Sequence, residues 1–220
     1  MLKFTVMKTP QRKYCKFYIA RHGETIWNVQ RRMQGHQDSP LTENGINQAK
    51  KVGEMLKDIK FAHAFSSDLI RAKRTAEIIS ADHDLVVKTS QLLRESRLGK
   101  FEGVELEIFL SELREAIEQR ESLAGEEKMK YQVHPEVETY EECSTRMITF
   151  LREVALAYPG ENMLVVSHAG IIRSTLVKMG FASDEELPHG AIKNTGYAVV
   201  ESDGVDFFVK ETVGIDKVSV

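Results

Sequence analysis

The chain contains little cysteine and no long apolar run. Of its 220 residues only Cys15 and Cys143 are cysteines. They lack the spacing of metal ligands, so reduced thiols and a cytoplasmic location are expected. No segment is apolar enough to span a bilayer, and residues 1–14 are basic and polar without the apolar core of a signal peptide. We expect residues 1–14 to form a tail or an added edge strand, and residues 15–220 to form a single domain.

A large excess of charge of either sign is also missing. The formal net charge is −3, so no surface that binds nucleic acid or an anionic membrane is indicated. An anionic substrate must therefore be attracted by a local cluster of arginines. Several histidines are scattered without ligand spacing, so neither a metal nor another cofactor is predicted. These histidines are His36, His63, His83, His134 and His189.

Strand-like and helix-like segments alternate along the chain. Strands are predicted over residues 16–20, 61–66, 85–89 and 163–166, and a closing hairpin over 197–201 and 207–212. Helices are predicted over residues 42–58, with Thr42 as N-cap, and over 68–80, 139–158 and 171–179. This order predicts an α/β fold, a three-layer sandwich whose mostly parallel central sheet has helices on both faces.

The stretch 104–138 departs from this alternation. It is rich in Glu, Lys and Arg, carries spaced apolar residues and has no clear strand, so a helical insertion is predicted. Two interpretations are open. The insertion either caps a site or forms a pair of solvated surface helices.

The most informative residues are Arg21, His22 and Gly23, which follow the first predicted strand. A neutral imidazole can attack phosphorus through its unprotonated nitrogen. A guanidinium can place two hydrogen bonds on phosphate oxygens, and a glycine lets the backbone approach an anion. Ligands of parallel α/β sheets bind beyond the carboxyl ends of the strands. Because Arg71 and His168 follow two further strands, three candidate phosphate ligands are expected to share one site.

The segment Arg21-His22-Gly23-Glu24-Thr25, with Asn28, resembles the signature of the histidine phosphatase superfamily, which includes the cofactor-dependent phosphoglycerate mutases. Further segments resemble the same family in the family's order. They are residues 34–45 as the loop into the first long helix, 66–76 with a second arginine, 93–103 with a proton donor and 165–170 with a second histidine. The resemblance covers the chain from residue 16 to its end.

The resemblance implies a role for each matching residue. His22 is implied as the nucleophile that forms a phosphohistidine, and Glu95 as the general acid and then base. The implied phosphate ligands are Arg21, Asn28, Arg71 and His168. The implied substrate-binding residues are Gln34, Gly35 and Ala169. The partner is then a small phosphorylated metabolite, without nucleic acid or membrane.

Some of these positions have plainer interpretations. His168 is alternatively a satisfied interior histidine, and Asn28 a polar residue at the start of a helix. Glu102 competes with Glu95 as proton donor. Arg74, on the helix that carries the second arginine, points elsewhere and is expected to be solvated.

The residues after Glu95 distinguish branches of the family. Mutases continue with the pattern Glu-Arg-x-Tyr-Gly-x-Leu, whereas residues 95–101 here read Glu-Ser-Arg-Leu-Gly-Lys-Phe. The tyrosine is absent and the arginine is displaced by one position. The loop 34–37 also lacks the tryptophan of the mutase pattern. These differences favour a phosphatase acting on a sugar phosphate or a similar metabolite, with a phosphoglycerate mutase and a non-catalytic phosphate-binding module as alternatives.

Overall fold

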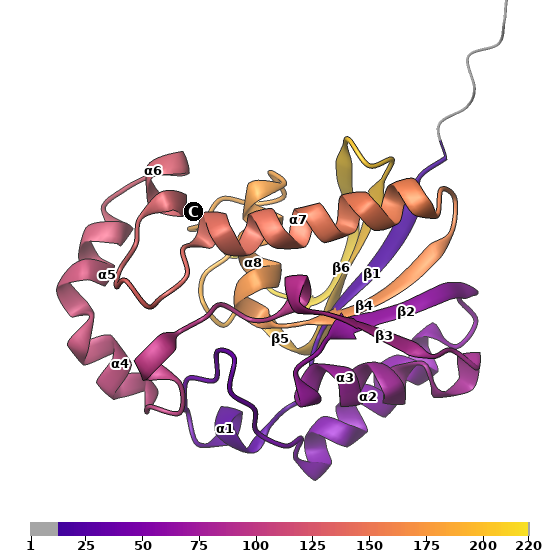
Figure 1. Cartoon of the computed structure of the whole chain (residues 1–220), viewed down its shortest axis with the longest axis horizontal. Helices are drawn as coiled ribbons and strands as arrows, with labels where there is room; N and C mark the ends of the chain where they lie inside the picture. The colour runs from indigo at the N-terminus through magenta and orange to yellow at the C-terminus, as the bar shows by residue number, and fades with distance from the viewer. Residues whose placement is uncertain (1–12, 220) are drawn as a thin grey trace, which may run out of the picture.

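The computed structural model describes residues 13–219 and contains one six-stranded sheet in the order β3-β2-β4-β1-β5-β6 (Figure 1). The strands are β1 (Cys15–Arg21), β2 (Phe61–Ser67), β3 (Val87–Ser90), β4 (Asn162–Ser167), β5 (Ile192–Ser202) and β6 (Phe207–Ile215). Strands β3, β2, β4 and β1 run parallel to one another, and β5 and β6 close the sheet as an antiparallel hairpin. The predicted mostly parallel sheet is confirmed.

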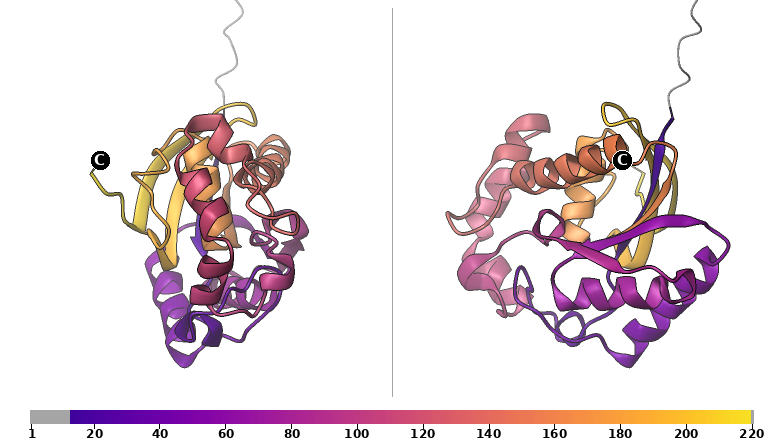
Figure 2. Two further views of the ribbon diagram at one scale, coloured as in Figure 1. Left: turned by 90° about the vertical axis from the view of Figure 1, so that its left-hand side faces the viewer. Right: turned by 45° about the vertical axis from the view of Figure 1, so that its right-hand side comes forward.

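Helices cover both faces of this sheet (Figures 1 and 2). The helices α2 (Glu43–Leu56) and α3 (Ile70–Ile79) pack on one face, and α7 (Tyr140–Ala157) and α8 (Ala169–Lys178) on the other. Successive side chains of β4 alternate between the two faces of the sheet, and both faces are covered. Met163 and Val165 belong to the core under α7 and α8, whereas Leu164 and Val166 belong to the core under α2 and α3. A continuous apolar run is what a strand buried on both faces requires.

Several predicted boundaries are confirmed by local contacts, and others move. Thr42 caps α2 as predicted, its Oγ1 accepting a hydrogen bond from the Gly45 N–H at 2.9 Å. Helix α3 begins at Ile70, later than predicted. Its cap comes from a distant residue, since the Asp38 carboxylate accepts from the Ile70 N–H at 2.6 Å. The third strand likewise begins at Val87, two residues later than predicted.

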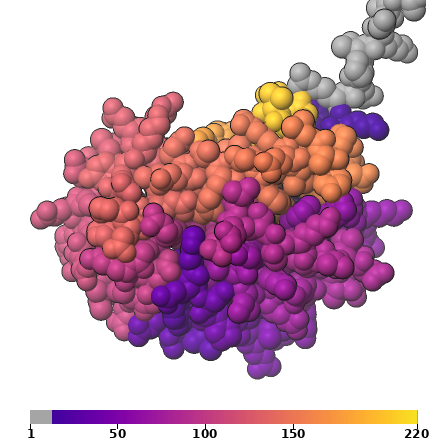
Figure 3. Space-filling model, in the orientation of Figure 1, coloured from indigo at the N-terminus to yellow at the C-terminus, as the bar shows by residue number. Residues whose placement is uncertain are grey.

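The predicted helical insertion consists of α4 (Leu106–Glu112), α5 (Arg114–Glu121) and α6 (Gly125–Lys130). It lies beyond the carboxyl ends of the parallel strands, near α1 (Ile26–Val29) (Figure 1). It has an apolar cluster of its own, in which Phe109 and Leu113 pack against Leu98 and Phe101. In the space-filling view, the segment after β1 lies between the insertion and the α2–α3 layer (Figure 3).

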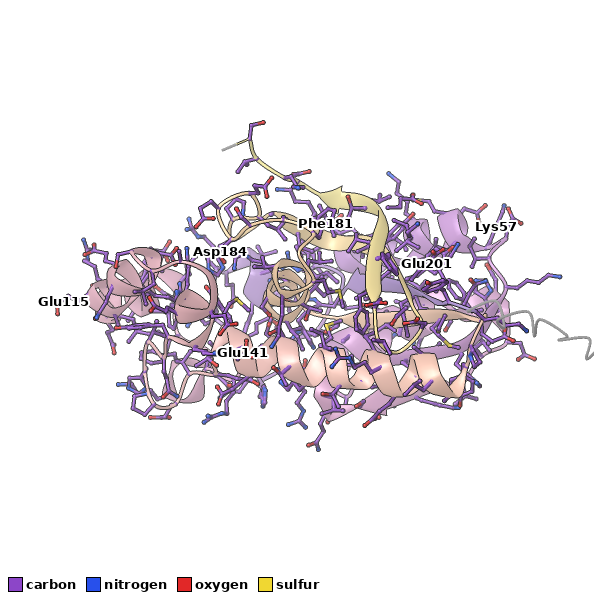
Figure 4. All side chains as sticks on the ribbon, turned by 90° about the horizontal axis from the view of Figure 1, so that it is seen from above. Lys57, Glu115, Glu141, Phe181, Asp184 and Glu201 are labelled. Carbon is purple, nitrogen blue, oxygen red and sulfur yellow. The ribbon has the colours of Figure 1, made fainter. Side chains whose placement is uncertain are left out.

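A network of charges attaches the insertion to the rest of the fold. Lys128 on α6 is 4% exposed, and its ammonium lies 2.7 Å from both the Glu121 and the Asp184 carboxylates. Asp184 lies in the loop after α8, beside the helices of the insertion (Figure 4). It also pairs with Arg173 at 2.6 Å. A buried ammonium is stable only when paired, so these contacts restrain the position of α6.

The prediction that residues 15–220 form a single domain stays a prediction. The predicted tail or edge strand over residues 1–14 falls almost entirely outside the described residues. Between residues 13 and 219, no helix is long and apolar enough to cross a membrane.

Candidate active site

His22 lies directly after β1 and is held on both sides. Its backbone N–H donates to the Ser167 carbonyl at 3.0 Å, and the N–H of Gly23 donates to Thr75 Oγ1 at 3.0 Å. No side chain fits at Gly23, because a Cβ there would lie 2.5 Å from the Gly45 carbonyl oxygen. Glycine at position 23 therefore allows the backbone after β1 to approach the backbone of α2 at Gly45 closely.

The His22 ring has a defined tautomer. Its Nδ1 lies 2.7 Å from the Gly23 carbonyl oxygen, which only accepts, so Nδ1 carries the proton and Nε2 is unprotonated. Burial lowers the pKa of the His22 imidazole well below its ordinary value, and the positive charges of Arg71 and Arg21 lower it further. The ring is therefore neutral at neutral pH, with a free electron pair on Nε2.

Arg71, at the start of α3, is 1% exposed and bound to the loop that follows α1. Its Nη1 donates to the Gln37 carbonyl at 2.6 Å and to the Asp38 carboxylate at 2.8 Å, and its Nη2 donates to the Gly35 carbonyl at 2.8 Å. A guanidinium has five N–H donors. Among residues 13–219 the Arg71 Nε has no acceptor, so its N–H is left to bind an oxygen of a phosphate.

Arg21 has the same donor available. Its Nη1 donates to the Ile192 carbonyl at 2.7 Å, and its Nε is buried without a hydrogen-bond partner among the described residues. Burial lowers the pKa of this guanidinium, the negative charge of Glu95 raises it and Arg71 lowers it. The two arginines are close enough to influence each other, so an anion between them would relieve their repulsion.

His168 lies across from His22, with 5.2 Å between the ring centroids. It is fully buried, and neither ring nitrogen has a partner within residues 13–219. Burial lowers the pKa of His168 well below its ordinary value, and Arg71 and His22 add to this effect. The alternative of a satisfied interior histidine does not describe this residue. Buried polar groups rarely lack partners, so both His168 nitrogens indicate a site for a polar ligand.

The Glu95 carboxylate is fixed by three backbone N–H groups. One oxygen accepts from Ser96 at 2.8 Å and from Ile171 at 3.1 Å, and the other accepts from Gly170 at 3.0 Å. Helix α8 begins two residues before the predicted position, so that Gly170 and Ile171 lie in its first turn. The unpaired N–H groups of that turn therefore hold the carboxylate.

The backbone around Glu95 is also anchored by side chains. Arg146 on α7 donates to the carbonyl oxygens of Glu95 at 2.9 Å and of Leu92 at 2.9 Å. The neighbouring Arg94 forms two hydrogen bonds with the Asp68 carboxylate, at 2.7 and 2.6 Å. Sequence reasoning missed Arg146, because an arginine 51 positions from the residue it supports carries no local signal.

Glu102, the competitor of Glu95, is used differently. One of its oxygens accepts from the backbone N–H groups of His36 at 2.9 Å and of Leu98 at 3.1 Å. It thus ties the loop after α1 to the segment that follows Glu95. Arg74 is exposed and pairs with Glu77 at 3.1 Å, as a solvated residue would.

Asn28 lies at the end of the signature, in α1. Its N–H donates to Thr25 Oγ1, and its Oδ1 accepts from the Thr25 N–H at 3.1 Å. The Oδ1 also accepts from Nδ2 of Asn194 at 3.3 Å. Asn194 belongs to β5, and no sequence motif pointed to it.

The three predicted substrate-binding residues differ in surroundings. Gln34 is 9% exposed and its Oε1 is buried without a partner among the described residues. Gly35 supplies the carbonyl oxygen that binds Arg71. Ala169 is half-buried and stands between His168 and Gly170 at the start of α8. Contact of these residues with a substrate stays a prediction.

The structure therefore brings together His22, His168, Arg21, Arg71 and Glu95 from four separate stretches of the chain. A mostly parallel α/β sheet with these groups at its carboxyl edge is an arrangement suited to phosphoryl transfer, which needs a nucleophile, positive charge and a proton donor. The family model of the histidine phosphatase superfamily (branch 1) matches residues 17–213, and the chain belongs to this superfamily.

Similar proteins include both phosphatases and mutases. The uncharacterized phosphatase PhoE of Bacillus subtilis is 33% identical over 185 residues, covering 83% of this chain and 86% of the relative. A probable phosphoglycerate mutase, GpmB of Yersinia pestis, is 35% identical over 173 residues, covering 77% of this chain and 78% of the relative. The crystal structure of phosphoglycerate mutase from Bacillus anthracis has a TM-score of 0.80 at 29% identity, covering 92% of this chain and 94% of that one.

Proposed function

We propose that this protein is a phosphatase that hydrolyses a small phosphorylated metabolite through a phosphohistidine intermediate. One observation carries the proposal. Within residues 13–219, the buried Arg21 Nε, Arg71 Nε and His168 ring nitrogens have no hydrogen-bond partners, and they lie around a neutral His22 whose Nε2 is unprotonated. Unpaired buried donors are costly, and a phosphate group supplies the acceptors that they lack.

In the first step, His22 Nε2 attacks phosphorus and forms an N–P bond while the bond to the leaving oxygen breaks. The Glu95 carboxyl group gives its proton to that oxygen. In the second step, Glu95 takes a proton from water, and the water oxygen forms a bond to phosphorus while the N–P bond breaks. Phosphate is released, the electron pair returns to His22 Nε2 and Glu95 is protonated again. Arg21 and Arg71 supply the positive charge that a magnesium ion supplies in other phosphoryl-transfer enzymes.

Two side chains favour hydrolysis over the mutase alternative. Leu98, at the position of the mutase tyrosine, is 7% exposed and packs in the apolar cluster of the insertion. Arg97 is exposed. The Leu98 side chain has no polar group that could retain a phosphorylated product for transfer back, and the arginine stands one position away from its place in the mutase pattern. The third alternative, a non-catalytic module, is disfavoured because nucleophile, cations and carboxylate are assembled together.

We also propose a small-molecule partner and a cytoplasmic location. The substrate is a small metabolite, and no nucleic-acid or membrane partner is proposed. Both Cys15 and Cys143 are buried and unpaired, as expected of a protein in the reducing cytoplasm.

A phosphate-release screen tests this function. The panel contains sugar phosphates, phosphoglycerates, phosphoserine and nucleotides, each assayed without added metal. Phosphorus NMR then follows 3-phosphoglycerate with a bisphosphoglycerate primer. We expect phosphate release to exceed isomerisation, and rapid formation of 2-phosphoglycerate would reverse the assignment in favour of a mutase.

A further inference from the structure

Asn194 lies in an irregular part of β5 beside the nucleophile. Regular pairing of β5 with β1 stops at the pair Tyr197–Ala20, and its register with β6 shifts between Ile192 and Tyr197. Within this interruption Thr195 has a φ of +57°, a left-handed conformation that is rare for a β-branched residue. Bulges of this kind commonly direct a side chain toward a functional site.

The bulge contacts two elements of the candidate site. Asn194 Nδ2 donates to the His22 carbonyl oxygen at 3.1 Å and to Asn28 Oδ1 at 3.3 Å. The backbone N–H of Thr195 also donates to the His22 carbonyl oxygen, at 3.3 Å. With Thr195 in this conformation, the Thr195 N–H and Asn194 Nδ2 both donate to the His22 carbonyl oxygen. Asn194 Nδ2 also donates to Asn28.

The orientation of the Asn28 amide follows from these contacts. Its Oδ1 accepts from the Thr25 N–H, from Thr25 Oγ1 and from Asn194. A backbone N–H is always a donor, so the atom facing it must be the oxygen. A reversed amide would place its NH₂ group against the N–H of Thr25 and the NH₂ of Asn194. The Asn28 NH₂ group is therefore on the other side of the amide, where it has no partner among residues 13–219.

We propose that Asn194 is a positioning residue for phosphoryl transfer: it holds the Asn28 amide with its NH₂ group available to the phosphate. Its own amide is fixed in turn, since an oxygen in place of Nδ2 would face both the His22 carbonyl and Asn28 Oδ1. The inference rests on the proposed function, in which Asn28 donates to the transferred phosphoryl group. A donor fixed before the reaction contributes more than one that must reorient.

A double-mutant cycle between Asn194 and Asn28 tests the proposal. The wild type, Asn194→Ala, Asn28→Ala and the double variant are compared by kcat/KM for p-nitrophenyl phosphate and by the Kd of orthovanadate. Asn194→Ala should lower kcat/KM about tenfold in the wild type, as expected for directly coupled residues. In the Asn28→Ala background the loss should be less than about twofold, because coupled residues are non-additive and Thr195 still binds the His22 carbonyl.

A matched variant separates positioning from folding. Lys193→Ala, next to Asn194 but exposed, should leave both kcat/KM and the Kd unchanged. Thermal unfolding of each variant shows whether the fold survives.

The outcomes distinguish this inference from the proposed function. Equal losses for Asn194→Ala in both backgrounds, or no loss in the wild type, would overturn the role of Asn194 while leaving the phosphatase assignment intact. If the wild-type protein binds orthovanadate but hydrolyses no phosphate ester, the phosphatase assignment is wrong. The double-mutant cycle can then still be evaluated from the Kd of orthovanadate. A wild-type protein that binds no orthovanadate would overturn both.

Discussion

The carboxylate of Glu95 lies directly against Gly170. The Gly170 N–H donates to one carboxylate oxygen at 3.0 Å, and a Cβ built on Gly170 would lie 2.6 Å from the other. The glycine is needed for space and not for an unusual backbone angle, since Gly170 has no positive φ. The first turn of α8 thus binds and positions the carboxylate of the proposed proton donor.

Substituting this glycine should therefore reduce activity without unfolding the protein. In Gly170→Ala the added methyl group displaces the Glu95 carboxylate, which is the end of a flexible side chain and can move. We expect at least about a tenfold loss of kcat with alkyl phosphates, within the contribution of general acid catalysis. Thermal unfolding should change little. Wild-type kcat in Gly170→Ala would show that the carboxylate position seen here is not the reactive one.

Removing the proton of Glu95 should matter most for a poor leaving group. An alkyl sugar phosphate leaves as a strong base and needs the proton, whereas nitrophenolate hardly does. Glu95→Gln should slow turnover of a sugar phosphate by about a hundredfold or more. The single-turnover rate of transfer from nitrophenyl phosphate should fall far less. Glu102→Gln should show neither the large loss nor the dependence on the leaving group. Equal losses for both leaving groups would assign Glu95 to substrate positioning.

The His22 nucleophile can be trapped directly. Wild-type protein incubated with radiolabelled substrate and quenched in alkali should retain label, because phosphohistidine survives there. His22→Ala should retain no label, because the substitution removes Nε2 of His22, the atom proposed to attack phosphorus. His63→Ala, a histidine that packs on Tyr158 away from the site, should label normally. Persisting label in His22→Ala would contradict the assignment.

The two arginines of α3 should differ sharply. Arg71→Ala removes a buried guanidinium and should cost more than ~2 kcal/mol of transition-state stabilisation. Arg71→Lys keeps the charge but loses the Nε–H donor and the planar guanidinium, so it should recover only part of kcat/KM. Arg74→Ala removes an exposed residue paired with Glu77 and should cost much less. Similar losses at both positions would mean that Arg71 does not bind the phosphate.

Stability should fall in acid because of the buried histidines. The pKa values of His22 and His168 are lowered by burial, so below about pH 6.5 the unfolded chain binds more protons than the folded one. The free energy of unfolding should then decrease as pH falls from 6.5 to 5.5. His168→Phe removes one such group and should flatten this slope by up to about 1.4 kcal/mol per pH unit. Urea titrations at three pH values measure it, and identical slopes would contradict the prediction.

Local patterns account for what could be predicted from the sequence. The apolar run of β4, the Thr42 cap and the alternation of elements each depend on neighbouring residues, so the layers of the fold were predictable. His22, Arg71 and His168 could be placed together because each follows a parallel strand, and those strand ends share one edge. Motif resemblance added Glu95 and Asn28, whose local surroundings alone left alternatives open.

Contacts between distant segments could not be predicted in the same way. Asp38 caps α3 and binds Arg71, and Arg146 supports Glu95, yet no periodicity or spacing relates these residues. Asn194 is a similar case, since its position follows from an interruption in β5.

The sequence by itself determined the order of strands and helices and the chemical groups at the strand ends, because hydrophobic periodicity and residue type act over a few positions. Only the tertiary structure decided how those groups are held. Within residues 13–219, the unpartnered nitrogens of Arg21, Arg71 and His168 and the contact of Glu95 with Gly170 all depend on which backbone groups are already occupied by other segments. Hydrogen-bond satisfaction is a property of the whole packed chain, and no local stretch of sequence specifies it.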